Sequence, residues 1–158
     1  MRRVFFAFAL ALAACGPSQQ PKSDAPAATT APAAEDAAAL QARVAALAPP
    51  YNQGSYEAGR RVFAQCRSCH AIEAGAPNRV GPNLHGVFGR QAGRAEGFAY
   101  SPALQEADFV WDASQLDNWL ANPSTFLPGN RMAFAGVRNE TQRRDLIAYL
   151  MVEAQPDE

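Results

Sequence analysis

Lysine is nearly absent from this chain: its 158 residues include a single one, Lys22. The formal net charge is -1 and the isoelectric point is near 6.1, so the chain lacks the basic surface that binding to nucleic acid requires. Long apolar runs are missing as well. The run from Val4 to Ala14 has eleven residues, about half the length of a membrane-spanning helix. These absences argue against nucleic acid as a partner and against a spanning helix in that run.

The first fifteen residues have the pattern of an export signal. Two arginines at positions 2 and 3 precede the apolar run, which stops at Cys15. The string Leu-Ala-Ala-Cys that ends at Cys15 resembles the lipobox of bacterial lipoproteins, whose cysteine is acylated and becomes the mature N-terminus. The resemblance implies a signal peptide over 1–14 and a lipid on Cys15. The alternative is an ordinary signal peptide with a cysteine near its cleavage site.

Composition divides the rest of the chain into a tether and a domain. From Gly16 to Ala34 the chain is rich in Ala, Pro, Ser and Thr and has no aromatic residue, which predicts a disordered tether. The segment from Glu35 to Ala48 is rich in helix formers and is either a short helix packed on the domain or part of the spacer. We therefore expect a lipidated tether with a possible short helix at 15–50, and one domain at 51–158.

Three helices are predicted in the domain. The first runs from about Ser55 to Gln65. The second begins after Asp112 and stops before Pro123, and the third follows Asn139. Asp112 and Asn139 each have a glutamine three residues later, which is the spacing of a capping box.

Long loops join these helices, and no strand is predicted. The segment 75–102 is rich in glycine and proline. Loops of that length are unusual in a small domain unless something besides protein fills the core. Arg143 and Arg144 are assigned to the solvated face of the third helix.

The string Cys66-Arg67-Ser68-Cys69-His70 is the most informative motif. A C-x-x-C-H run predicts covalent haem attachment, with both thiols bound to the porphyrin and the histidine offered to the iron. One alternative is a C-x-x-C redox pair, which usually occurs in a βαβ context that is absent here. The other is half of a zinc site, for which the spare ligands are Cys15 and His85.

The second axial ligand decides what such an iron does. A methionine gives a closed, six-coordinate iron suited to electron transfer, whereas an open position means ligand binding or peroxidase-type chemistry. Met1 leaves with the signal, and Met151 falls in the third predicted helix. Met132 falls in a Pro-Gly loop outside any predicted helix, so we expect Met132 to be the ligand. The alternative is a loop residue that packs on the core.

From Gly59 to the third helix the chain resembles mitochondrial cytochrome c and its bacterial relatives, the class I c-type cytochromes. Besides CRSCH, the matching strings are GPNLHGVFGR at 81–90, YS at 100–101, Trp111, NP at 122–123, LPG at 127–129, MAFAG at 132–136 and DLIAYL at 145–150. The resemblance implies an all-α, class I cytochrome c fold, with three main helices and long loops wrapped around one covalent haem c. It also implies an electron-transfer protein and not an enzyme.

The resemblance implies a role for each matching site residue. Cys66 and Cys69 would bind the haem, and His70 and Met132 would ligate its iron. The main-chain carbonyl of Pro82 would accept the His70 Nδ1 proton.

Four further residues would contact the haem. Arg90, Tyr100 and Trp111 would hold one haem propionate with paired donors. Trp119 stands where the family commonly has a tyrosine bonded to the methionine sulfur. Gly59 would let the third helix cross the first closely, through Leu146 and Tyr149.

Charge is the main departure from the family. The mitochondrial protein carries a ring of lysines around its haem edge, whereas residues 51–158 have no lysine, ten arginines and twelve acidic residues. Ser124 and Thr125 replace two of those lysines, Arg131 remains, and Asn130 stands where threonine is usual. Electrostatic steering toward an acidic partner should be weak, and tethering could replace it.

The expected function is transfer of single electrons on the periplasmic side of a bacterial cell-envelope membrane, by a lipid-anchored monomer. The donor would be a quinol-oxidising complex and the acceptor a terminal oxidase. Two alternatives stay open. One is a ligand-binding or catalytic haem protein whose Met132 dissociates readily, and the other is a permanently bound subunit of an oxidase or dehydrogenase.

Overall fold

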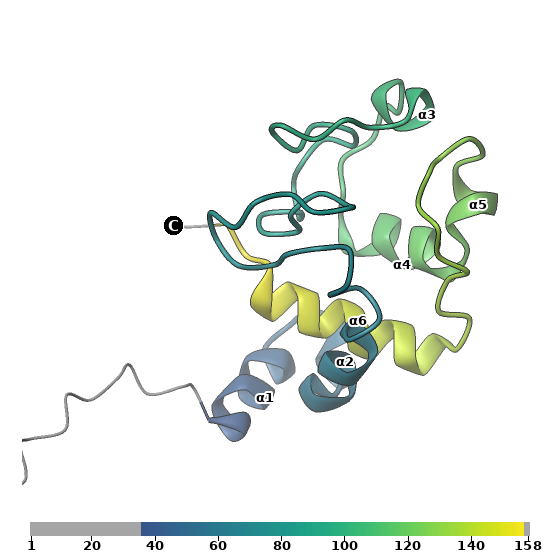
Figure 1. Cartoon of the computed structure of the whole chain (residues 1–158). Coiled ribbons are helices and arrows are strands. Elements are labelled where there is room, and N and C mark those ends of the chain that lie inside the picture. The colour runs from purple at the N-terminus through teal and green to yellow at the C-terminus, as the bar shows by residue number, and fades with distance from the viewer. Residues whose placement is uncertain (1–35, 157–158) are drawn as a thin grey trace, which may run out of the picture. The chain divides into compact units, whose positions relative to one another are not determined.

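The computed structural model describes residues 36–156, which form helices joined by long loops (Figure 1). In chain order the helices are α1 (Ala37–Ala45), the 3-10 turn η1 (Tyr51–Gln53), α2 (Tyr56–Phe63), α3 (Pro102–Gln105), α4 (Ala113–Ala121), α5 (Pro123–Phe126) and α6 (Glu140–Glu153). Within 36–156 there is no β-strand, and one isolated antiparallel bridge joins Gln91 to Val110. The predicted all-α fold is confirmed. The predicted signal peptide, Cys15 and the predicted tether at 16–34 lie outside the described residues.

None of the helices in residues 36–156 has both the length and the apolar character needed to cross a membrane.

Side-chain caps set where the main helices begin. The Asp112 carboxylate accepts the Gln115 N–H at 2.7 Å at the start of α4, and the Asn139 side chain accepts the Gln142 N–H at 2.9 Å at the start of α6. Both predicted N-caps are confirmed. Helix α2 ends at Phe63, two residues before the predicted Gln65, and the chain continues in turns toward the C-x-x-C-H segment.

Helices α2 and α6 cross closely at Gly59. A Cβ at this position would lie 2.1 Å from the Asp145 carbonyl oxygen and 2.6 Å from the Tyr149 Cβ. The predicted close crossing is confirmed. The part of α6 nearest to Gly59 is the main chain of Asp145 and not Leu146. The Tyr149 ring also lies 5.2 Å from the ring of Phe63, which extends the contact along α2.

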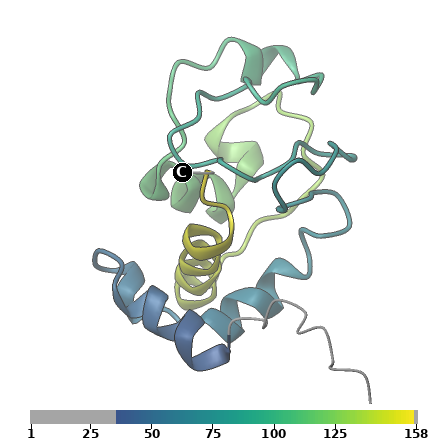
Figure 2. The same cartoon turned by 90° about the vertical axis from the view of Figure 1, so that its left-hand side faces the viewer.

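Helix α1 packs on the α2–α6 pair, so the folded region begins before residue 51. Both views place α1 and α2 on one side of α6, with α3, α4 and α5 on the other (Figure 2). Val44 is fully buried in the core. The Gln41 side chain donates to the Gly54 carbonyl at 3.0 Å and accepts the Tyr56 N–H at 2.9 Å. The Arg43 guanidinium donates to a carbonyl in the last turn of α6 at 2.9 Å.

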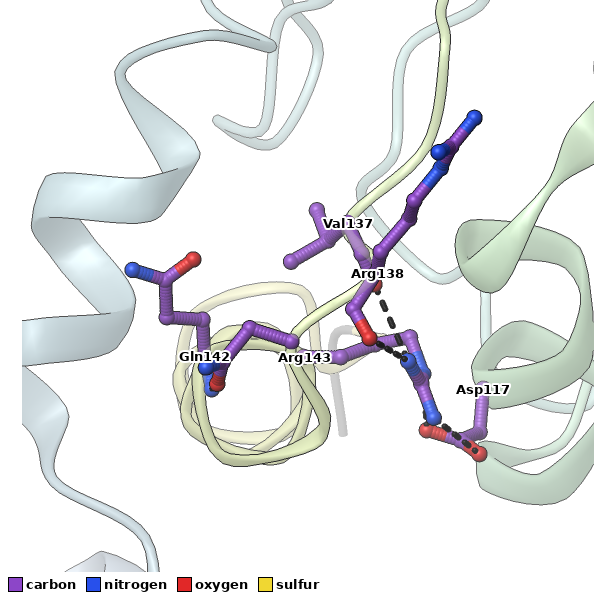
Figure 3. Close-up of polar contacts among 6 residues, drawn as sticks. Asp117, Val137, Arg138, Gln142 and Arg143 are labelled. Atoms are coloured by element: carbon purple, nitrogen blue, oxygen red, sulfur yellow. Dashed lines mark hydrogen bonds and ion pairs between the residues drawn. The ribbon is translucent and has the colours of Figure 1, made fainter.

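The assignment of Arg143 to a solvated face is wrong. This side chain points from α6 toward α4, and the residue is 8% exposed (Figure 3). Its Nε donates to the Asp117 carboxylate at 2.7 Å, and its Nη1 donates to the Val137 carbonyl at 2.9 Å. The physical reason is that α4 places the Asp117 carboxylate beside the face of α6 that was expected to be solvated. Arg144 is more exposed, with its guanidinium 3.8 Å from Asp145.

Candidate haem site

A cavity of about 600 Å³ lies between the loops and helices α3, α4 and α6. Cys66, Cys69, His70 and Met132, the residues expected to bind the haem and its iron, all line this cavity. Its volume falls in the range of ligand and cofactor pockets. Most of its remaining lining is apolar. The structure therefore brings together four residues that span 67 positions of the chain.

The turns after α2 position the two cysteines. The Cys66 N–H donates to the Phe63 carbonyl at 2.8 Å, and the Cys69 and His70 N–H groups both donate to the Cys66 carbonyl, at 3.0 and 2.9 Å. Both thiols are free and half-buried. Burial, with a smaller contribution from Cys69, raises the pKa of Cys66 to about 11, so this thiol is protonated at neutral pH.

His70 is held in one orientation by its neighbours. Its Nδ1 lies 2.8 Å from the Pro82 carbonyl oxygen. Because a carbonyl only accepts, Nδ1 carries the proton and Nε2 keeps its lone pair for a metal. Burial lowers the pKa of His70, and the bond to Pro82 partly offsets that effect, so the ring is neutral near pH 7.

Gly81 packs directly against the His70 ring, which the sequence reasoning missed. A Cβ on Gly81 would lie 2.3 Å from His70 Cε1 and 2.7 Å from both ring nitrogens. Only a residue without a side chain fits there. The glycine in the GPNLHG string was a signal that could have pointed to this contact.

Asn130 fixes the loop that carries Met132. Its side-chain oxygen accepts the Met132 N–H at 2.9 Å, and its side-chain nitrogen donates to the carbonyls of Pro123 and Leu127, at 2.9 and 2.8 Å. The sequence showed Asn130 only as a polar substitution. In the structure, Asn130 links the loop to α5 and fixes the position of the Met132 main chain.

A ring of four aromatic side chains stands beside the cavity. Trp111 and Trp119, which both line the cavity, meet edge to face with centroids 5.5 Å apart. Phe126 lies 5.9 Å from Trp119 and 5.6 Å from Phe109, and Phe109 lies 4.8 Å from Trp111, all in edge contacts. Both tryptophans are buried and both phenylalanines are partly buried, so this wall of the cavity is apolar.

Arg90, Tyr100 and Pro82 complete the predicted set, and all three line the cavity. The Arg90 guanidinium donates to the main-chain oxygens of His85 and Asn83, at 3.2 and 3.1 Å, and its burial lowers its pKa. Neither Asp nor Glu is among the described residues that line the cavity. A half-buried guanidinium in such surroundings favours a ligand that brings its own anion.

These observations fit a haem. The cavity offers apolar walls for a porphyrin, two thiols for its vinyl groups, an oriented imidazole and a thioether for its iron, and a guanidinium for a propionate. Elsewhere in residues 36–156, His, Cys, Asp and Glu form no cluster of three that could hold a metal ion.

Comparison with known proteins agrees with this geometry. The family model for cytochrome c matches residues 56–152. Cytochrome c of Kluyveromyces lactis is 43% identical over 103 residues, which cover 65% of this chain and 94% of that protein. Cytochrome c2 of Rhodoblastus acidophilus is 44% identical over 97 residues, which cover 61% of this chain and 91% of that protein.

A solved structure shows the same relationship. Cytochrome cH from Methylobacterium extorquens superposes with a TM-score of 0.58 at 42% identity, covering 62% of this chain and 98% of that one. Helix α1 precedes the residues that the family model matches. With the C-x-x-C-H turn, the all-α fold and these relatives in agreement, the chain belongs to the cytochrome c family of electron carriers with covalently bound haem c.

Proposed function

We propose that this chain is a membrane-tethered monohaem cytochrome c, with His70 and Met132 as the axial ligands of the iron. The observation that carries the proposal is that both side chains line the same cavity as Cys66 and Cys69. A haem bound there supplies a reversible one-electron couple.

The protein's own residues favour rapid electron transfer to and from such a haem. The Pro82 carbonyl and Gly81 hold the His70 ring in one orientation, and Asn130 holds the loop at Met132. The aromatic ring of Trp111, Trp119, Phe109 and Phe126 gives the cavity an apolar wall. An environment that is fixed and apolar reorganises little when the charge changes by one, and this favours rapid electron transfer over ligand chemistry.

The proposal places the chain on the periplasmic side of a bacterial cell-envelope membrane, held by a lipid on Cys15. It would move electrons from a quinol-oxidising complex to a terminal oxidase as a monomer. Two sequence features support the tether: the lipobox-like string that ends at Cys15 and the Ala/Pro-rich segment that follows. The lysine-free domain supports it indirectly, because confinement at a membrane raises the effective concentration of partners without charge steering.

Replacing the anchoring cysteine tests this proposal. In cells that mature c-type haem, the wild type should fractionate with membranes, and Cys15→Ser should appear in the soluble periplasmic fraction with an unchanged haem spectrum. In isolated membranes, quinol-driven reduction of the haem and its reoxidation by oxygen should both slow in Cys15→Ser. Equal fractionation and equal turnover of the two forms would contradict the tethered-carrier proposal.

A further inference from the structure

Helix α1 and the turn η1 lie outside the part of the chain that matches the family. The family model begins at residue 56, whereas the described structure begins at residue 36. Of the described residues, none before Gln65 lines the haem cavity. The haem site therefore gives no reason for α1, and the reason has to lie in the contacts that α1 makes with α2 and α6.

Apolar side chains hold α1 on the domain. Val44 is fully buried, and Leu40 and Leu47 are partly buried against the same core. Their i, i+4, i+7 spacing places them on one face of a helix. Helix α1 has nine residues, and helices shorter than about 12 residues are marginal by themselves in water. Helix α1 therefore depends on its contacts with the domain to stay formed.

Gln41 attaches α1 to the start of α2. Its side-chain amide accepts the Tyr56 N–H at 2.9 Å and donates to the Gly54 carbonyl at 3.0 Å. Tyr56 is the first residue of α2, and the first N–H groups of a helix have no partner within that helix. Gln41 therefore caps α2 from a different helix. A Cβ on Gly54 would lie 2.7 Å from the Ala148 Cβ, so α6 closely contacts the same junction.

Arg43 attaches α1 to the end of α6. Its guanidinium donates to the Val152 carbonyl at 2.9 Å, in the last turn of α6. The last carbonyls of a helix lack partners within it and carry partial negative charge, which favours a cation there. The Tyr56 hydroxyl completes the set, because it donates to the Glu153 carboxylate at 2.9 Å. Helix α1, the start of α2 and the end of α6 are thus each bonded to the other two.

We propose that α1, through Gln41 and Arg43, is a clasp that couples the start of α2 to the end of α6, so that both ends loosen only when α1 leaves. Helix α2 leads to Cys66, and α6 supplies Leu146 and Leu150 to the cavity lining. The clasp therefore closes the pair of helices that carries haem attachment and one cavity wall. The segment before residue 36 joins the domain at α1 and not at α2. The inference is independent of the proposed electron transfer, because its contacts lie outside the haem site.

Amide hydrogen exchange of the holoprotein tests this coupling. Two variants each remove one attachment, Gln41→Ala at the start of α2 and Arg43→Ala at the end of α6. Alanine is the strongest helix former, so neither change weakens α1 as a helix in itself. Loss of one hydrogen bond should raise the population of undocked α1 about two- to twelvefold.

The decisive amides lie at the end that each variant does not touch. Gln41→Ala should speed exchange of the Ala154 amide, which donates to Leu150 in the last turn of α6, about two- to twelvefold or more. Arg43→Ala should speed exchange of the Tyr56 amide by about two- to twelvefold. An effect confined to the end that each variant touches would overturn the clasp, as would no effect at either end.

Three control variants separate the clasp from other causes. Gln53→Ala and Arg138→Ala remove exposed side chains of the same two kinds and should change neither rate. Arg143→Ala removes the bond from α6 to Asp117 in α4 and lowers the stability of the domain without touching α1. It should leave the Tyr56 and Ala154 amides unchanged, because they exchange when α1 leaves. Equal acceleration of both amides in Arg143→Ala would mean that they report unfolding of the whole domain, and would overturn the inference.

Discussion

The His70 ring depends on a glycine that leaves it room. In Gly81→Ala, the new Cβ would meet three ring atoms at 2.3 to 2.7 Å, so the imidazole must shift from its place in the cavity lining. We expect weaker axial ligation, a partial change to a high-spin spectrum, and a loss of about 1–3 kcal/mol of stability from overpacking. Optical spectra and denaturant titration measure these effects.

Pro82→Ala is the control for this variant. It retains the main-chain oxygen that accepts the His70 Nδ1 proton, so the spectrum should stay low-spin. An unperturbed spectrum in Gly81→Ala would mean that the ring does not rely on this contact.

Tyr56 links stability to alkaline pH. Its hydroxyl donates to the Glu153 carboxylate at 2.9 Å, and burial, followed by this bond, raises the pKa of Tyr56 above its ordinary 10.0. Above that value the unfolded chain releases the proton and the folded chain retains it. Stability should therefore be complete below about pH 10 and fall as pH rises further. Denaturation midpoints between about pH 9 and 11 should fall less steeply in Tyr56→Phe; parallel curves would refute the link.

The haem cofactor was predictable from the sequence because its chemistry restricts the choice of residues. A haem needs two thiols at fixed spacing and a histidine beside them, and the sequence offers one such string, at 66–70. The supporting residues were not visible in this way. Asn130 acts by accepting the main-chain N–H of Met132, and Gly81 acts by having no side chain beside the His70 ring. Both effects depend on contacts that form only in the folded structure.

At the scale of elements, Arg143 joins α6 to α4. Arg143→Ala would leave the Asp117 carboxylate and the Val137 carbonyl without this donor. We expect a loss of about 2–4 kcal/mol, less than for a fully buried pair because the Asp117 side chain is 35% exposed. Urea denaturation measures this loss.

Arg144→Ala provides the comparison on the same helix. The Arg144 side chain is 29% exposed and 3.8 Å from Asp145, so its removal should cost less than about 1 kcal/mol. Similar losses in the two variants would contradict the role assigned to the α4–α6 link.

The helices were predictable to different degrees. The starts of α4 and α6 follow from Asp112 and Asn139, because a cap is a local interaction. Whether the segment 35–48 packs on the domain was left open, because its apolar residues fit either a docked helix or a spacer. Burial of Val44 against the other helices decides it, and sequence pattern alone does not reveal that contact.

At the scale of the whole molecule, the fold depends on its cofactor. Without a haem, the apolar lining of this cavity of about 600 Å³ would face water, and the loss of that burial would remove much of the small net stability of a typical domain. The double variant Cys66→Ala, Cys69→Ala cannot attach haem, and we expect it to lose most of its helix. Far-UV circular dichroism of the purified chain measures this, and a fully helical, haem-free chain would contradict the expectation.

The distribution of charge was also readable from the sequence, whereas the exposure of individual apolar side chains was not. The absence of lysine from residues 51–158 is a matter of counting. The exposure of Val80, which lines the cavity, depends on how the loop at 75–81 folds against His70, and only the structure shows it.

The identity of the second axial ligand is the most direct test of the account. The measurement is an optical spectrum of the matured holoprotein, wild type and Met132→Ala, with and without carbon monoxide. The account predicts a low-spin wild type with the weak methionine–iron charge-transfer band and no response to the gas, and a Met132→Ala form that lacks the band and binds carbon monoxide. A wild type that is already high-spin, or that takes up carbon monoxide readily, would contradict the electron-carrier account and favour a ligand-binding haem protein.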